Sequence, residues 1–175
     1  GFYYFYLDSL RIAKHYPFKM KPTYPKHSDW RSIFKQAHQC LSERYALVIC
    51  LVDMDVVYNK PTEKTAYQKA KAKAEKAKIK VIETNPYTDF WFLLHFLPNL
   101  STKTYVSYDD VVKDLRRYLP GYEKSKKYFK KIQPYQYLAE YGDLERAVSY
   151  AKQLYTLAQQ TPEDLHSYTQ IHELL

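Results

Sequence analysis

The chain has 175 residues and a formal charge of +8, from 27 Lys and Arg against 19 Asp and Glu. Its 46% hydrophobic residues and three glycines allow a buried core and exclude a disordered or collagen-like chain. Because Cys40 and Cys50 are too few for a disulfide framework and no apolar run approaches the roughly 20 residues of a membrane helix, we expect a cytoplasmic protein without a membrane partner.

Apolar residues recur at helical spacing from the beginning of the chain. They predict a helix over residues 2–13 that ends before Pro17. The chain starts at Gly1, without methionine and without the basic segment of a signal peptide. We therefore expect it to begin inside a longer product.

Two further elements are expected before the first long apolar run. Residues 18–24 alternate apolar and polar side chains and predict a short strand, which Pro22 places at a sheet edge. Ser28 or Asp29 can cap a helix that runs through Trp30 and ends near Glu43.

The central part of the chain predicts a parallel sheet. Residues 45–52 form a continuous apolar run, typical of a strand covered on both faces, and the run stops at Asp53. Residues 62–78 predict an exposed helix, and residues 79–83 predict a second strand. This alternation predicts an α/β fold with a doubly wound, mostly parallel sheet, whose ligands lie beyond the carboxyl ends of the strands.

The remainder of the chain predicts helices. They are expected over residues 89–97, 109–118, 122–131, 144–159 and 163–175. No linker interrupts the chain, so we expect a single domain over residues 1–175. Within it, residues 1–100 would form the α/β core and residues 101–175 a helical extension.

Asp53 and Asp55 are the strongest candidates for chemistry. Alternate residues of a strand point to the same side, so both carboxylates can converge on one hard cation such as Mg²⁺ or Mn²⁺. The alternative is that these acids belong to a turn or cap at the end of the strand. Two carboxylates are few for a catalytic Mg²⁺, so a third acid is expected from elsewhere.

The segment 85–95 contains a second set of candidates. His95 could act as a general acid or base or contact phosphate, and it shares a helical face with Trp91. A single histidine in an apolar helix is also typical of a hydrogen-bonded core residue. Asp89 could serve the chemistry or merely complement the helix dipole.

Basic residues concentrate in two windows. Residues 60–80 contain eight Lys against two Glu, a composition typical of a solvated helix face. Residues 113–131 contain eight Lys and Arg against two acids, interleaved with aromatic residues that could stack on bases. The alternative for this second window is a solvated face with tyrosines packed inward. Its candidate nucleic-acid-binding residues are Arg116, Arg117, Lys124, Lys126 and Lys127.

Four motifs together resemble the RloB family over nearly the whole chain. They are Asp53-Met54-Asp55, Asn85-Pro86-x-x-Asp89-x-Trp91-x-Leu93-Leu94-His95-Phe96, Pro120-Gly121-Tyr122-x-Lys124 and Thr169-Gln170-Ile171-His172-x-Leu174. The resemblance implies a Toprim-like domain with a helical extension, in phage defence by abortive infection, often beside an AAA-type ATPase. It implies that Asp53 and Asp55 match the D-x-D that holds Mg²⁺ for phosphodiester chemistry.

Two departures from the family pattern matter. The family's first strand and its glutamate, the third metal ligand, would lie just before Gly1. Either the sequence is a truncated product or this member has lost the site. The family also usually has an aromatic residue and Glu where this chain has Thr88 and Asp89. Asp89 keeps the carboxylate on a shorter arm and can still support a metal or a base.

The resulting expectation is a Mg²⁺-dependent nuclease for DNA or RNA. Asp53 would bind the metal, Asp55 would bind it or position its water, and His95 with Lys124 would contact the phosphate. The alternative is a non-catalytic module that binds nucleic acid or a partner ATPase through basic, tyrosine-rich helices. A primase-like or topoisomerase-like use of the same acids is a third possibility, but no nucleophilic tyrosine can be chosen among twenty.

Overall fold

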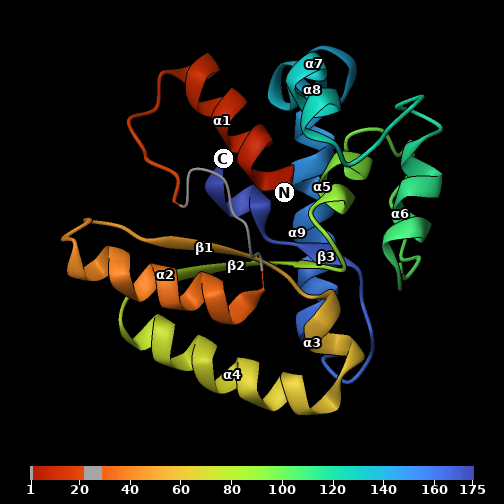
Figure 1. The fold of residues 1–175 in the computed structure, drawn as a ribbon. Coiled ribbons are helices and arrows are strands. Elements are labelled where there is room, and N and C mark those ends of the chain that lie inside the picture. The colour runs from red at the N-terminus through yellow and green to blue at the C-terminus, as the bar shows by residue number, and fades with distance from the viewer. Residues whose placement is uncertain (1, 22–28) are drawn as a thin grey trace.

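The protein is described by a computed structural model that covers residues 2–21 and 29–175 (Figure 1). Its elements, in chain order, are α1 (Phe2–Lys14), α2 (Trp30–Ser42), β1 (Ile49–Asp53), α3 (Asp55–Asn59), α4 (Pro61–Lys76), β2 (Lys80–Asn85), α5 (Asp89–Leu94), α6 (Tyr108–Leu115), α7 (Lys126–Ile132), α8 (Pro134–Tyr141), α9 (Leu144–Gln160), β3 (Tyr168–Thr169) and the 3₁₀ helix η1 (Ile171–Leu174). Within these residues, no helix is long and apolar enough to span a membrane.

The sheet of the described residues has three strands in the order β1-β2-β3. β1 and β2 are parallel, and Asp53 at the end of β1 pairs with Thr84 near the end of β2. β3 runs antiparallel to β2, where Thr84 pairs with Thr169. The mixed α/β class expected from the sequence is therefore confirmed, with one antiparallel strand beside the parallel pair. The carboxyl ends of β1 and β2 meet at one edge of this sheet.

Helices cover both faces of the sheet (Figure 1). α2 and α4 lie on one face, where Trp30, Phe34 and Tyr67 pack with alternate residues of the strands such as Cys50 and Val81. The other face is covered by α1 and by the helices that follow β2. The apolar runs of both strands follow from this arrangement, because a strand covered on both faces needs apolar side chains on each.

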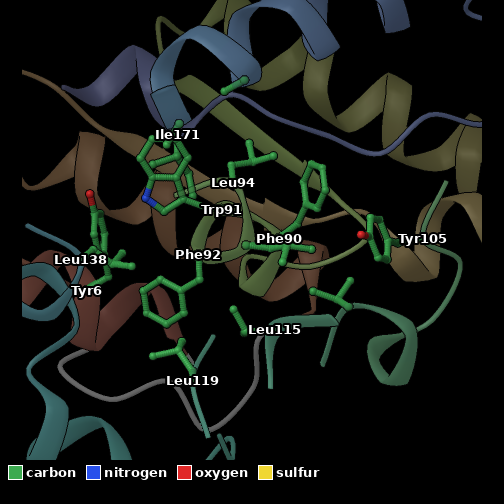
Figure 2. Close-up of a cluster of buried hydrophobic side chains, with 14 of the residues drawn as sticks. Tyr6, Phe90, Trp91, Phe92, Leu94, Tyr105, Leu115, Leu119, Leu138 and Ile171 are labelled. Atoms are coloured by element: carbon green, nitrogen blue, oxygen red, sulfur yellow. The ribbon is translucent and has the colours of Figure 1, made fainter. Parts of the chain in front are cut away.

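The larger core surrounds α5, a short helix whose six residues are all buried (Figure 2). Trp91, Phe92 and Leu94 are fully enclosed, in one cluster with Tyr6 of α1 and Leu115 of α6. Ile171, close to the carboxyl end of the chain, belongs to the same cluster. The segment 101–175 thus shares its core with the first hundred residues.

A buried carboxylate on β2 connects α4 to the segment near the end of the chain. Glu83 of β2 accepts hydrogen bonds from the hydroxyls of Tyr67 (2.7 Å) and Tyr168 (3.1 Å). It also forms an ion pair with Lys71 (2.8 Å). The backbone N–H of Gln170 donates to the Glu83 carbonyl. These contacts satisfy a charge that would otherwise be costly to bury, and they join α4, β2 and β3.

Several elements differ from the expectation. The Asp29 cap is confirmed, since its carboxylate accepts the Ser32 N–H at 3.1 Å. Of the strand expected over residues 18–24, residues 18–21 form no strand, and residues 22–24 lie outside the described residues. Ser28, the other candidate cap, also lies outside them. The helix expected over residues 163–175 was wrong: this segment holds β3 and η1. Helices α3 and α8 were not predicted.

Candidate functional site

Asp53 lies at the carboxyl end of β1 and is held by the loop that follows β2. Its Oδ1 accepts hydrogen bonds from the backbone N–H of Thr88 (2.9 Å) and from the Thr88 hydroxyl (2.7 Å). Its Oδ2 has no hydrogen-bond donor among the described residues. Burial raises the pKa of Asp53 to about 6, against the lowering effect of the Thr88 hydrogen bonds and of the Lys124 charge. One carboxylate oxygen is therefore fixed and the other is available to a ligand.

Asp55 is the first residue of α3 and does not belong to the strand. The expectation that both acids point to one side of a strand was wrong, because Met54 turns the backbone into the helix at φ −94° and ψ 1°. Asp55 still faces the site. Its carboxylate interacts with the Tyr87 hydroxyl, and burial together with the Asp55 charge raises the pKa of Tyr87. The charges of Asp53 and Asp89 also raise the pKa of Tyr87, by smaller amounts.

Asp89 opens α5 and is completely buried. Its Oδ1 accepts a hydrogen bond from the Tyr122 hydroxyl, and its Oδ2 lies 3.3 Å from the Lys124 ammonium. That ammonium also lies over the rings of Tyr87 and Tyr108, at 5.4 and 5.0 Å from their centroids. Lys124 is far along the chain from the strands, yet the structure brings it to the acids.

Further polar groups complete the site. The Tyr3 hydroxyl of α1 donates to Thr84 Oγ1 at 2.7 Å, and Thr84 Oγ1 lies 2.8 Å from Thr169 Oγ1. Burial and the Asp53 charge raise the pKa of Tyr3. Tyr3, Thr84 and the hydrogen-bonding role of Thr88 were not predicted from the sequence. The available signal was the position of Thr88, directly before the candidate Asp89 and shortly after the second predicted strand.

His95 lies at the opposite end of α5 from Asp89, about 9 Å along the helix axis. It is 2% exposed, and its Nδ1–H donates to the Trp91 carbonyl at 2.9 Å. Its ring meets the Trp91 ring at 4.6 Å, and its Cβ fills the space that a Cβ on Gly142 would need. Burial lowers the pKa of His95 to about 4. This placement is the core environment that the sequence analysis held open, and the structure does not bring His95 to the acids.

The five basic candidates have different surroundings. Lys124 is in the site, and the Arg116 guanidinium donates to the Tyr122 carbonyl at 3.1 Å, which fixes the loop that carries Lys124. Arg117 is exposed and lies 3.6 Å from Asp114. Lys126 and Lys127 are exposed on the first turn of α7. The structure thus separates one lysine in the site from a basic surface beside it.

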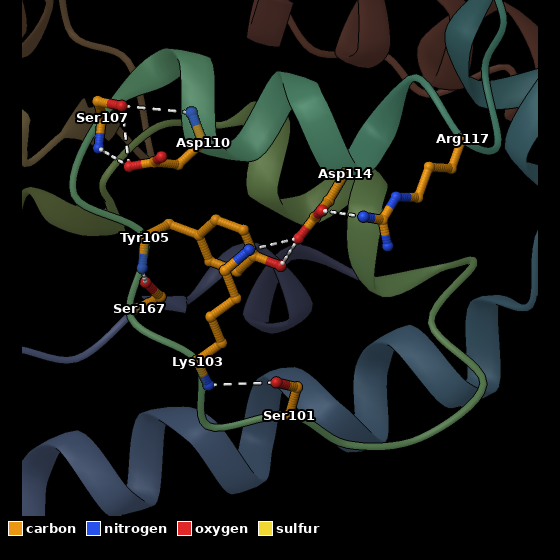
Figure 3. A network of polar contacts seen from close by, with 8 residues as sticks. All are labelled: Ser101, Lys103, Tyr105, Ser107, Asp110, Asp114, Arg117 and Ser167. Atoms are coloured by element: carbon orange, nitrogen blue, oxygen red, sulfur yellow. Dashed lines mark hydrogen bonds and ion pairs between the residues drawn. The ribbon is translucent and has the colours of Figure 1, made fainter.

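A polar network anchors α6, which carries Tyr108 and is followed by Arg116 (Figure 3). Ser107 and Asp110 form a reciprocal cap at its beginning. Asp114 accepts from the Tyr105 hydroxyl at 2.9 Å and pairs with Lys103 at 2.7 Å. These contacts hold both ends of α6 and so fix the helix that carries Tyr108, one of the two rings under the Lys124 ammonium.

The donor set can be compared with the needs of a divalent cation. Among the described residues, no three His, Cys, Asp or Glu side chains are placed to hold one ion. Mg²⁺, however, commonly keeps several waters and binds through one or two carboxylates. Asp53, with its available Oδ2, and Asp55, at the start of α3, offer two carboxylates of this kind. The residues present therefore fit a largely hydrated Mg²⁺ or Mn²⁺.

These features define an α/β protein with a carboxylate and lysine site beyond the carboxyl ends of two parallel strands. A family model described as RloB-like protein matches residues 4–175. The chain belongs to the RloB-like family, as its sequence motifs indicated. No curated protein and no solved structure matches it.

Proposed function

We propose that this protein is a Mg²⁺-dependent nuclease with a Toprim-type site. The observation that carries the proposal is the open carboxylate oxygen of Asp53, with Asp55 two residues later at the start of α3 and the Lys124 ammonium held against Asp89. This combination suits a phosphodiester, which needs a cation on one oxygen and a positive charge beside it. The resemblance to the family, expected to act in abortive infection, supports the same conclusion.

Each residue then has a defined task. Asp53 and Asp55 would hold the cation, with the Thr88 hydrogen bonds orienting Asp53. When bound, the cation would polarise the phosphate and lower the pKa of the attacking water. The Lys124 ammonium would contact the phosphate, and the exposed Lys126 and Lys127 would follow the backbone of the nucleic acid beside it. His95 keeps a packing role in this scheme.

Cleavage assays test the proposal. The natural full-length protein would be incubated with plasmid DNA, single-stranded DNA and tRNA in Mg²⁺, Mn²⁺ or EDTA, with and without an AAA-type ATPase encoded alongside. We expect cleavage only with the divalent cation. Asp53→Asn should reduce it at least about a hundredfold, because the first ligand is lost.

Asp164→Asn is the matched control, since Asp164 is exposed and outside the site. It should cleave like the unmodified protein. Cleavage in EDTA, or undiminished cleavage by Asp53→Asn, would contradict the proposal. Binding without cleavage that ignores both Mg²⁺ and Asp53→Asn would instead support a non-catalytic nucleic-acid-binding module.

A further inference from the structure

The three acids of the site are not equivalent. Asp89 is completely buried, and both of its carboxylate oxygens have partners, Oδ1 with Tyr122 and Oδ2 with Lys124. Asp53 is partly exposed, and its two hydrogen bonds fall on the same oxygen. The protein itself therefore satisfies Asp89, whereas Asp53 retains an oxygen for an external ligand.

Lys124 is held from several sides. Its ammonium is paired with Asp89 and lies over the faces of Tyr87 and Tyr108, which attract a cation through their ring quadrupoles. The loop that carries it is fixed by Arg116 on the Tyr122 carbonyl. The Lys124 side chain is still 34% exposed, so it remains accessible to a ligand.

The charges divide in the same way. Among the residues that the structure describes, Asp89 and Lys124 neutralise each other, which leaves the negative charges of Asp53 and Asp55 for one divalent cation to balance. A second divalent cation would need Asp89, whose oxygens are already occupied.

We propose that the site takes a single divalent cation on Asp53 and Asp55, and that Lys124, positioned by Asp89 between Tyr87 and Tyr108, takes the place of a second cation facing the phosphate. This inference rests on the proposed function. In this arrangement Asp89 positions Lys124 and does not bind the metal, a role that its sequence position had left open.

Mn²⁺ binding tests the division without any need for activity. The stoichiometry and Kd would be measured by the electron paramagnetic resonance signal of free Mn²⁺ and by calorimetry. The unmodified protein should bind one Mn²⁺. Asp53→Asn should weaken binding at least about tenfold, because it removes a ligand, whereas Asp89→Asn should change Kd by less than about threefold.

Lys124 variants give a second, independent readout. Lys124→Met should release the Asp89 carboxylate and add a second Mn²⁺, and the double variant Asp89→Asn with Lys124→Met should bind one again. Lys124→Arg keeps the charge and should bind one. Lys73→Met, which removes an exposed lysine of α4, is the matched control and should leave binding unchanged. A thermal melt of each variant verifies that it is folded.

The outcomes separate the two proposals. Two Mn²⁺ ions on the unmodified protein, an Asp89→Asn loss as large as that of Asp53→Asn, or one ion with unchanged Kd in Lys124→Met would each overturn the inference and leave the metal site standing. If Asp89→Asn does not fold, the Lys124→Met result decides. No Mn²⁺ binding, or none that depends on Asp53, would overturn the proposed function as well.

Discussion

Replacing Trp91 with Ala should lower the free energy of unfolding by about 3–5 kcal/mol. Trp91 is fully buried in the middle of α5, beside Tyr6 (Figure 2). The centroid of its ring lies 6.4 Å from that of Tyr6 and 4.6 Å from that of His95. Truncation leaves a cavity where α1, α5 and the end of the chain meet, and a short helix cannot close it. The effect would be measured by urea denaturation.

Tyr141→Ala is the control for this experiment. Tyr141 is also aromatic and helical, but it is 60% exposed, so its removal should cost less than about 1 kcal/mol. A loss of less than about 1 kcal/mol in Trp91→Ala would show that α5 is not the centre of the core.

Replacing Asp53 with Asn should stabilise the metal-free fold at pH 8, by as much as about 3 kcal/mol. The folded protein raises the Asp53 pKa from 3.8 to about 6, mainly through burial. Between these values the folded state binds a proton that the unfolded chain does not, so the carboxylate lowers stability as pH rises from about 4 to 6. Asn carries no charge and avoids this loss.

The pH dependence of this stabilisation tests its cause. The difference in the free energy of unfolding between Asp53→Asn and the unmodified protein, measured by urea denaturation in EDTA, should be largest above pH 6. It should shrink toward zero as the pH falls to about 4. Asp164→Asn should lie within about 0.5 kcal/mol of the unmodified protein throughout. A less stable Asp53→Asn at pH 8 would contradict the placement of Asp53 in a desolvated site.

His95 contributes the opposite slope. Its pKa is lowered from 6.5 to about 4 by burial, so between these values the unfolded chain binds a proton that the folded protein does not. Stability from this group is lost as pH falls from about 6.5 to 4. The two slopes oppose each other in the unmodified protein. In Asp53→Asn only the His95 effect remains, so the free energy of unfolding should fall by about 3 kcal/mol between pH 6.5 and pH 4.

The parallel strands could be predicted because their sequences carry the reason for their structure. A continuous, β-branched apolar run of this length is typical of a strand covered on both faces, and Asp53 is the residue at which the run and the strand end. The short β3 had no comparable signal. It exists because Tyr168 and Thr169 pair with β2, a contact between segments far apart in the chain.

The same limit applies to the site. Asp53, Asp89 and Lys124 were candidates from the sequence, and the structure places them together. Tyr108 could not be chosen among twenty tyrosines, and Tyr122 stood in a quoted motif without an assigned role, since only tertiary packing brings them to Lys124 and Asp89. His95 is the opposite case: it belongs to the same sequence motif as Asp89, yet the length of α5 separates the two residues.

The central claim is that Asp53 and Asp55 together hold one divalent cation. An anomalous difference map from crystals grown with Mn²⁺ tests it most directly. We expect a single peak within about 2.5 Å of a carboxylate oxygen of each residue, with Lys124 still on Asp89. A peak bound to Asp89, or no peak at Asp53 and Asp55 with saturating Mn²⁺, would contradict the account.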